Sequence, residues 1–311
     1  MPDQTSSPFS VQGKRALITG AGSGINFCFA RLLLSKGCSV LIADLTLRPE
    51  AQKLVDEHSS GSPRAVFHKT DVTDWPQLEA AFQACNKEFG GIDIVGPGAG
   101  VFEPPWSNFW YPPGDPESKD AKDGNSYKTL DINLNHPIRT TQLAISHFLN
   151  PADPKEKASL QNPKRVILTS SIAGQGANLA CPLYFVSKHG ISAFCRSMAS
   201  LDSTLGIRIN AVAPGIVKTP LFTDNPHKLR WIDDEADLWI TPEQIAEQML
   251  RLLEDDELVG GTILEVGQAH QRVVPMFNNP GPQGGAGMQS SNGQFAIDEA
   301  FEKLGTKGWG E

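Results

Sequence analysis

The sequence predicts a doubly wound α/β fold, in which one parallel β-sheet carries helices on both faces. Three observations predict it. Short apolar segments alternate with longer segments of helical periodicity, a glycine-rich turn follows the first short segment, and an acid ends the second. Strands separated by helices form a parallel sheet whose faces those helices cover. We therefore expect a single domain with its ligand site beyond the carboxyl ends of the strands.

The first strand, turn, helix and second strand form the most specific unit. Residues 15–19 read as a buried strand, Gly20-Ala-Gly-Ser-Gly24 as a tight turn, and residues 25–36 as an amphipathic helix. A second strand, residues 39–43, ends at Asp44, about 20 residues after the turn. This is the dinucleotide-binding unit of the Rossmann fold. Its helix N-terminus stabilises the pyrophosphate, and its acid accepts hydrogen bonds from the adenosine ribose.

The alternation of strands and helices then continues. Further strands are predicted over residues 65–68, 92–95, 165–169, 208–212 and 262–266. Further helices are predicted over residues 49–58, 75–89, 127–149, 184–201 and 242–253. Glycine, serine and aspartate residues follow several of these strands. They mark the turns that would face a ligand.

Several stretches do not fit the alternation and set the domain organisation. A polar tail, residues 1–12, precedes the sheet domain, residues 13–274. A Gly/Pro-rich extension, residues 275–311, follows it. Inside the domain, residues 150–163 form a polar surface insert and residues 102–126 an aromatic, proline-rich one.

The aromatic insert, residues 102–126, follows the fourth strand and so leaves the sheet on the ligand side. Its prolines exclude a regular helix or a central strand. Its large aromatic residues are Trp106, Phe109, Trp110 and Tyr111. They could pack on the protein's own surface or on a second subunit. Alternatively they could cover an apolar pocket, with Phe222, Trp231 and Trp239 approaching from the other side, and a bulky, largely apolar substrate would then be preferred.

Composition excludes several classes of function. A net charge of -8 and a pI near 5.4 give no electrostatic footprint for nucleic acid or an anionic membrane. No apolar run approaches the roughly 20 residues that span a bilayer. The five cysteines are scattered without metal-binding spacing. We expect reduced thiols, no bound metal and a cytoplasmic location.

Tyr184 and Lys188 lie four residues apart in a segment of helical periodicity, so both side chains would stand on one helix face. A phenol titrates near pH ~10, and a neighbouring ammonium favours the phenolate and lowers that value. The pair could therefore exchange a proton with an alcohol or a carbonyl group. The spacing alone is weak, and a solvated helix surface is the common alternative.

The motifs around this pair occur in one order and are specific together. They are Thr19-Gly20-Ala-Gly-Ser-Gly24-Ile25, Asp71-Val72, Asn133, Ser171, Tyr184-x-x-x-Lys188 and Pro214-Gly215-Ile-Val-Lys-Thr219. From about Gly13 to Val266 the chain resembles the short-chain dehydrogenase/reductase family. The Tyr184–Gly190 stretch and the Asp255–Gly260 stretch look like the branch that contains 15-hydroxyprostaglandin dehydrogenase.

The resemblance implies a role for each of four catalytic residues. Tyr184 would be the general acid/base, and Lys188 would lower its pKa and hold the nicotinamide ribose. Ser171 would hydrogen-bond the substrate oxygen and stabilise its developing charge. Asn133 would hold a water that links Lys188 to solvent.

The resemblance also implies the cofactor contacts. Gly20, Ser23, Gly24 and Ile25 would surround the pyrophosphate, Asp71 and Val72 would flank the adenine, and Ala99 and Gly100 would allow close approach to adenosine. Pro214, Gly215, Val217 and Thr219 would also bind the cofactor, and Val217 and Thr219 would fix the nicotinamide carboxamide. Asp44, followed by Leu45 rather than an arginine, would accept from both ribose hydroxyls and repel a 2′-phosphate, which favours NAD.

Two positions depart from the family pattern. Asn26 stands where the third glycine of the turn is usual, so some loosening between helix and strand is expected. Pro97-Gly98-Ala99-Gly100 stands where Asn-Asn-Ala-Gly is usual, so asparagine hydrogen bonds that support the sheet would be lost.

We therefore predict an NAD-dependent oxidoreductase that interconverts a secondary alcohol and a ketone. The alternatives are an NADPH-dependent ketoreductase of a biosynthetic pathway, or a redox-silent relative that binds or cyclises a ligand. The resemblance further implies a homodimer or homotetramer formed through the helices that contain Asn133 and Tyr184.

Overall fold

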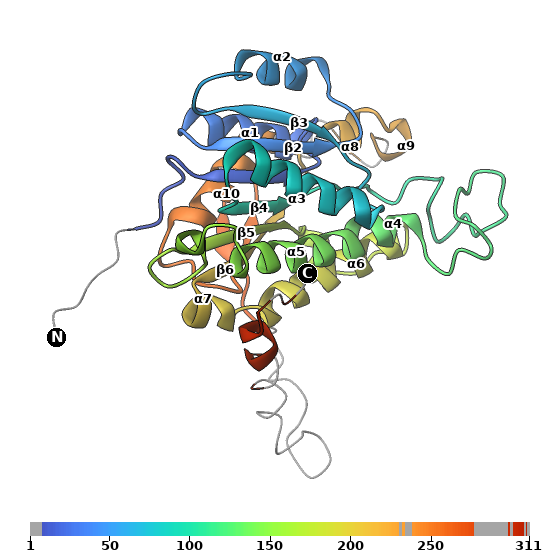
Figure 1. Cartoon of the computed structure of the whole chain (residues 1–311). Coiled ribbons are helices and arrows are strands. Elements are labelled where there is room, and N and C mark those ends of the chain that lie inside the picture. The colour runs from blue at the N-terminus through green and yellow to red at the C-terminus, as the bar shows by residue number, and fades with distance from the viewer. Residues whose placement is uncertain are drawn as a thin grey trace, which may run out of the picture.

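The computed structural model describes residues 8–229, 232–233, 238–276, 298, 301–307 and 309. An eight-stranded sheet with the order β3-β2-β1-β4-β5-β6-β7-β8 forms its centre (Figure 1). The strands are β1 (Arg15–Thr19), β2 (Ser39–Asp44), β3 (Ala65–Lys69), β4 (Ile94–Pro97), β5 (Lys164–Thr169), β6 (Ile207–Pro214), β7 (Ile263–Val266) and β8 (Gln271–Val273). Neighbouring strands from β3 to β7 pair in parallel, and β8 pairs antiparallel with β7. The predicted doubly wound fold is confirmed.

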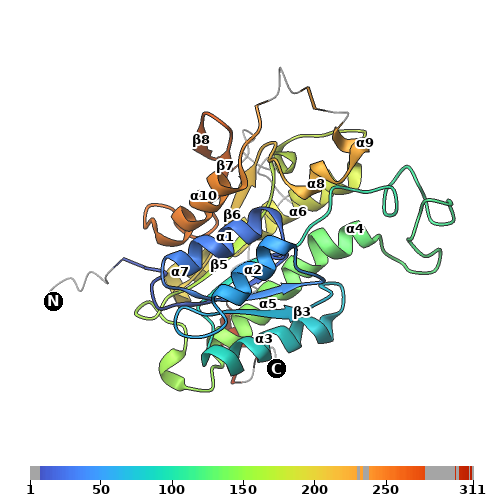
Figure 2. The same cartoon turned by 90° about the horizontal axis from the view of Figure 1, so that it is seen from above.

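Two layers of helices cover the sheet (Figure 2). The α-helices are α1 (Gly24–Ser35), α2 (Pro49–Glu57), α3 (Trp75–Phe89), α4 (Lys128–Leu130), α5 (His136–Leu149), α6 (Pro182–Ser197), α7 (Ser200–Leu205), α8 (Pro220–Thr223), α9 (Pro226–Leu229) and α10 (Pro242–Glu254). Along β1, Ala16 and Ile18 pack in the core layer of α1, α2 and α10, whereas Leu17 packs with α3, α5 and α6. This is the two-residue period of a strand that is buried on both faces.

Strand β1 occupies the point where the order of the sheet reverses, because it pairs with β2 on one side and β4 on the other. Connections from these two strands run to opposite sides, which leaves a crevice at their carboxyl ends. The glycine turn after β1 and the insert after β4 both open into this region.

The observed helices and strands lie close to the predicted ranges, with a few differences that follow from backbone chemistry or from a weak apolar pattern. β4 begins at Ile94 rather than at residue 92. The strand predicted to be last is followed by β8, whose three residues, Gln-Arg-Val, are all exposed and carry no apolar alternation. The helix predicted to run to residue 201 ends at Ser197, and α7 follows as a separate helix.

The helix predicted over residues 127–149 is interrupted by a π-helical segment, Asp131–Asn135. The amide of His136 donates to the carbonyl of Asp131, five residues back instead of four. Pro137 has no N–H, so the Asn133 carbonyl lacks the donor that a regular α-helix would give it. The sequence therefore contained the cause of the interruption, which falls at a predicted site residue.

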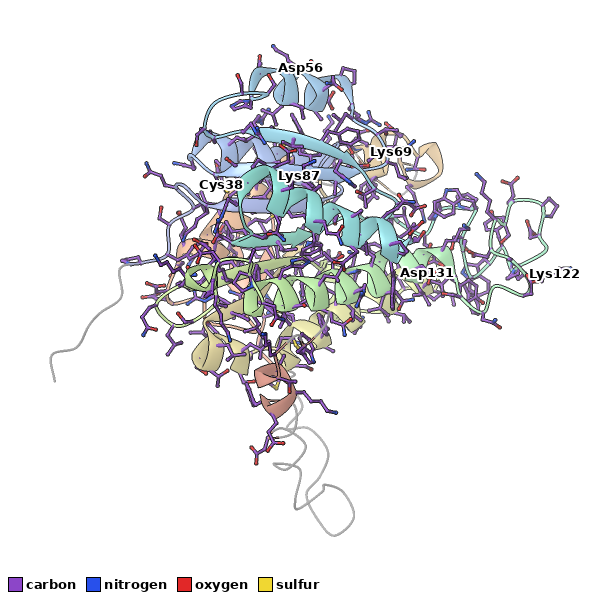
Figure 3. All side chains as sticks on the ribbon, in the orientation of Figure 1. Cys38, Asp56, Lys69, Lys87, Lys122 and Asp131 are labelled. Carbon is purple, nitrogen blue, oxygen red and sulfur yellow. The ribbon has the colours of Figure 1, made fainter. Side chains whose placement is uncertain are left out.

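The aromatic insert projects from the carboxyl edge of the sheet before the chain returns at α4 (Figure 1). Figure 3 places Lys122 far out on this insert and Asp131 at its base. The polar insert, residues 150–163, contains a 3₁₀ turn, Pro154–Glu156, and Glu156 forms ion pairs with Arg15 and Lys164. It thereby contributes to the amino edge of the sheet.

In the C-terminal extension, most of the Gly/Pro-rich stretch lies outside the described residues. Residues 301–305 are helical. Phe301, Leu304 and Trp309 pack against the core layer between the sheet and helices α3, α5 and α6. The hydroxyl of Ser146 on α5 donates to the Trp309 carbonyl at 2.9 Å. All five cysteines are buried free thiols, as expected for reduced side chains. In the part of the chain that the structure describes, every helix is too short or too polar to span a bilayer.

Candidate active site

A cleft of about 850 Å³ lies at the carboxyl ends of the central strands. Its wall includes every residue that we predicted for the site except Asn133. The predicted residues on this wall are Gly20, Ser23, Gly24, Ile25, Asp44, Asp71, Val72, Ala99, Gly100, Ser171, Tyr184, Lys188, Pro214, Gly215, Val217 and Thr219. Residues far apart in the chain thus meet in one place, as the fold requires.

The turn after β1 is held tightly against the end of β4. Gly20 has a φ of +71°, and a Cβ atom there would lie 2.5 Å from the Cα of Ala99. The amides of Gly98 and Ala99 donate to the Thr19 hydroxyl at 3.0 and 3.3 Å. That hydroxyl also lies 3.0 Å from Nε2 of His136, which is fully buried. Only glycine allows this approach at position 20.

Asp44 is fixed at the end of β2 by backbone donors. Its Oδ2 accepts from the Gly22 amide at 2.8 Å, and its Oδ1 accepts from the Leu45 amide at 2.7 Å. The carboxylate therefore joins the glycine turn to the segment after β2 and remains on the cleft wall. Each oxygen has further acceptor capacity for a ribose hydroxyl.

The N-terminus of α1 has the features of a phosphate-binding end. Its N-cap residue, Ser23, makes no side-chain capping bond, and its first turn contains no acidic residue. Amides and the positive end of the helix dipole are therefore directed toward the cleft that Ser23 and Gly24 line. This half of the cleft has the groups that a dinucleotide would need, because the α1 amides could donate hydrogen bonds to a pyrophosphate and the Asp44 carboxylate could accept hydrogen bonds from a ribose.

Asn26 does not loosen the turn as expected. It is 6% exposed, and its Nδ2 donates to the carbonyl of Gly98 at 2.8 Å. A Cβ atom at position 98 would lie 2.3 Å from the amide nitrogen and oxygen of Asn26. The two departures from the family pattern are therefore one feature. An asparagine on the helix fills the space above a glycine on the strand, where the family usually has glycine on the helix and asparagine on the strand.

Tyr184 and Lys188 stand on one face of α6, as predicted. The Lys188 Nζ lies 5.5 Å from the centre of the Tyr184 ring and donates to the Thr169 carbonyl at the end of β5, at 2.8 Å. Ser171 follows the same strand. Its hydroxyl accepts from the Ala173 amide at 3.1 Å and contacts the Pro214 carbonyl at 3.5 Å. The three side chains converge on one part of the cleft.

Burial dominates the electrostatics of the Tyr184–Lys188 pair. It raises the pKa of Tyr184 to about 12, although a hydrogen bond with Ser171 opposes that shift. It also lowers the pKa of Lys188 to about 8. We expected the ammonium to lower the pKa of the phenol. For the protein alone that expectation is wrong, because the loss of solvation at Tyr184 outweighs the opposing hydrogen bond with Ser171.

Asn133 lies in the π-helical segment behind the cleft wall and is 1% exposed. Its Oδ1 accepts from the Val101 amide and its Nδ2 donates to the Val101 carbonyl, both at 2.8 Å. The Nδ2 also approaches the hydroxyl of Ser187 at 3.4 Å. The side-chain amide thus anchors the start of the aromatic insert. A water held at this residue would have to use its main-chain carbonyl.

Aromatic rings line the other half of the cleft. Phe102 packs edge-on against Tyr184 with the ring centres 4.6 Å apart, and it contacts Phe222 at 5.3 Å. The Trp239 ring packs edge-on against the Phe222 ring, with the ring centres 5.7 Å apart. Phe102 and Phe222 both belong to the cleft wall. Trp231, which we expected near them, lies outside the described residues.

The four aromatic residues at the middle of the insert do not line the cleft. Phe109, Trp110 and Tyr111 are exposed, and Trp110 donates from Nε1 to the Leu179 carbonyl at 2.8 Å. Phe109 and Trp110 pack edge-on against each other at 5.0 Å. The insert therefore contributes to the pocket through Phe102 at its base, and of the two alternatives for the four rings the structure does not show the one in which they cover the pocket.

Sequence reasoning missed several residues of the apolar wall. They are Phe102, Ile172, Ala177, Cys181, Phe185 and Leu221. They stand on loops or first turns, where no periodicity marks which side faces a cavity. The available signal was that each lies in the connection that leaves a predicted strand, or within one helical turn of Tyr184.

Comparison with known proteins agrees with this geometry. The family described as short chain dehydrogenase matches residues 14–230. The NAD(+)-dependent 15-hydroxyprostaglandin dehydrogenase of Homo sapiens is 31% identical over 273 residues, which cover 82% of this chain and 91% of that protein. A hydroxynaphthalene reductase-like protein of Metarhizium robertsii is 31% identical over 228 residues, 72% of this chain and 76% of that protein. Among solved structures, a 3-ketoacyl-(acyl-carrier-protein) reductase from Brucella melitensis, complexed with NADH, has a TM-score of 0.67 at 22% identity. It covers 83% of this chain and 98% of that one.

Proposed function

The chain belongs to the short-chain dehydrogenase family, in a branch similar to 15-hydroxyprostaglandin dehydrogenase, and we propose that it uses NAD to interconvert a secondary alcohol and its ketone. We propose further that this substrate is bulky and largely apolar. One observation carries this proposal. The Tyr184 ring lies on the wall of a cleft whose one half fits a dinucleotide and whose other half is aromatic. A proton-transfer group is thus placed between a cofactor site and an apolar substrate site.

The chain's own residues supply position and a proton. In alcohol oxidation, the Tyr184 oxygen would accept the hydroxyl proton, and the Ser171 hydroxyl would hydrogen-bond the same substrate oxygen. NAD, when bound, would supply the hydride acceptor and a positive charge. That positive charge favours the phenolate and would offset the burial that raises the pKa of Tyr184. Ketone reduction uses the same groups in reverse.

Lys188 and Asn133 would connect this proton to solvent. The Lys188 Nζ already donates to the Thr169 carbonyl and retains two further N–H groups for a ribose hydroxyl or a water. Because Pro137 cannot donate to the Asn133 carbonyl, that oxygen can accept from a water in the π-helical segment. We propose that the relay uses this carbonyl and not the side-chain amide of Asn133, which is bonded to Val101.

The choice of NAD over NADP rests on charge at the adenosine end. Asp44 is held with its carboxylate on the cleft wall, where a 2′-phosphate would meet a negative charge. Arg48, in the segment after β2, forms an ion pair with Asp224 of the loop after α8. Its positive charge is therefore directed to a protein carboxylate.

The substrate class rests on the aromatic half of the cleft. Phe102, Phe222 and Phe185 offer ring surfaces, and Asn178 adds a polar group. The named substrates of the relatives, a hydroxyprostaglandin and a hydroxynaphthalene, are themselves large and partly apolar. The hydroxynaphthalene reductase-like relative favours ketone reduction as a second candidate direction. The cytoplasmic location and the homodimer or homotetramer predicted above remain parts of this proposal.

The test is turnover by the full-length protein with NAD and with NADP over a series of secondary alcohols of rising apolar size. We expect kcat/KM to rise from 2-butanol through 2-octanol to 1-tetralol, because each buried methylene contributes about 0.8 kcal/mol, roughly fourfold. We also expect at least about a tenfold preference for NAD. A preference for short alcohols, sugars or NADP would contradict the proposal. Binding of the alcohols without turnover by either cofactor would favour the redox-silent alternative.

A further inference from the structure

Glu103, at the base of the aromatic insert, is a carboxylate with 0% of its surface exposed. Its φ is +39°, in the left-handed region that residues other than glycine rarely adopt. A buried charge on an unfavourable backbone persists only where the surrounding structure holds it firmly. Neither the family motifs nor the cleft wall accounts for this residue.

The amides that donate hydrogen bonds to the Glu103 carboxylate belong to two separate segments. Its Oε2 accepts from the backbone amide of Tyr184 at 2.9 Å, and its Oε1 accepts from the backbone amide of Phe109 at 3.2 Å. Burial raises the pKa of Glu103, while these amides, the Leu183 amide and the positive charge of Lys228 oppose that rise. Lys228 is itself 6% exposed. The carboxylate thus joins the insert, the start of α6 and α9, which lie on one side of the molecule (Figure 2).

Helix α6 has no side-chain cap of its own. Its N-cap residue, Cys181, makes no capping hydrogen bond, and Pro182 follows it. By contrast, α10 begins with a complete capping box formed by Thr241 and Gln244. The first amides of a helix need acceptors, and a negative charge at this end is favourable. Glu103 provides both to α6 from 81 residues away in the chain.

The neighbouring residue contacts the same target. Phe102 packs against the Tyr184 ring, while Glu103 holds the Tyr184 amide. We propose that Glu103 is a positioning residue that caps α6 from the insert and thereby sets the place of the Tyr184 phenol in the cleft. The base of the insert and the residue that transfers the proton then form one unit, so a change in the insert alters turnover as well as substrate fit.

The first experiment follows amide exchange and does not depend on the proposed function. Glu103→Gly removes the carboxylate. Because glycine adopts the left-handed conformation without strain, any faster exchange in this variant would come from the lost cap and not from a strained backbone. We expect deuterium exchange over residues 181–188 to become at least about tenfold faster, as for the loss of hydrogen bonds to a charged group. The capped start of α10 should not change. Glu117→Gly, at an exposed carboxylate of the same insert, is the matched control.

The second experiment measures kinetics and rests on the proposed function. With NAD and 1-tetralol, Glu103→Gly should lower kcat about tenfold or more through misplacement of Tyr184. The dissociation constant of NAD should stay within about twofold. Glu103→Gln keeps one acceptor and should restore most of both the exchange protection and kcat. It also keeps the test open if the glycine variant does not fold.

Two results would overturn the inference. Exchange over residues 181–188 could rise no more in the Glu103 variants than in Glu117→Gly, and Glu103 would then not cap α6. Faster exchange with an unchanged kcat would refute the positioning role. If the wild-type protein oxidises no alcohol, the proposed function fails, while the exchange experiment still decides whether Glu103 caps α6.

Discussion

On the cofactor side of the cleft, the side chains are held by hydrogen bonds to backbone amides in the turns that follow the central strands. Asp44 is bonded to the glycine turn, and Thr19 to the end of β4. On the substrate side, ring contacts hold Phe102, Phe222 and Trp239, of which Phe102 and Trp239 lie outside helices and strands and Phe222 lies in the short helix α8. Backbone hydrogen bonds fix direction, whereas ring contacts tolerate repacking. The cofactor half should therefore respond sharply to single changes and the substrate half gradually.

Tyr184 lies where the two halves meet, and its removal should have the largest effect. Tyr184→Phe removes the hydroxyl and little volume, so kcat should fall by about 10²- to 10⁴-fold. The dissociation constant of NAD should change little, because the ring contact with Phe102 remains. Tyr111→Phe, on the exposed part of the insert, is the control. If turnover of the Tyr184 variant survives within about threefold, the phenol is not the acid/base.

The next largest effect belongs to the cofactor half. Asp44→Ala removes the acceptor of the Gly22 and Leu45 amides together with the proposed ribose contact. NAD affinity, measured by titration calorimetry, should fall about 10- to 100-fold, and NADP should bind relatively better. Asp56→Ala, on the exposed side of α2, should leave both affinities unchanged (Figure 3). Equal losses for NAD and NADP would assign Asp44 a role in the turn alone.

A third prediction tests whether Asn26 and Gly98 act as one unit. Gly98→Asn places a side chain on top of Asn26, and such overpacking costs about 1–3 kcal/mol of stability. The double variant Asn26→Gly/Gly98→Asn restores the family arrangement. It should recover melting temperature and NAD affinity beyond the sum of the single changes. A double variant no better than Gly98→Asn would show that the two positions are independent.

The sequence predicted the cofactor half better than the substrate half, for a physical reason. Asp44 and Gly20 belong to a local unit in which turn, helix and strand determine one another within about 30 residues. Asn26 was misjudged because its partner, Gly98, is distant in sequence, and each was considered alone. His136 was missed for the same reason, since its contact is with Thr19.

On the substrate side, no local rule determines where a loop residue points. Phe102 and Glu103 are adjacent, yet one lines the cleft and the other is fully buried beneath it. The backbone at Glu103 is left-handed, which no sequence pattern of a non-glycine residue indicates. The four aromatic residues farther along were the visible signal, and they lie outside the cleft wall.

The smallest effect, and the one that most directly distinguishes the two halves, concerns Phe222 and Trp110. Phe222 lines the cleft between Phe102 and Trp239, so Phe222→Ala opens the pocket and removes two ring contacts. One aromatic contact between Phe222 and the substrate would be worth about 0.5–1.5 kcal/mol, so its loss should raise KM for 1-tetralol about 2- to 12-fold, with kcat and NAD affinity unchanged. Trp110→Ala removes a ring of similar size that is 50% exposed and bonded to Leu179. It should leave KM unchanged.

A raised KM in both variants would mean that the insert closes over the bound substrate. A raised KM in Trp110→Ala alone would move the apolar site from the base of the insert to its exposed middle.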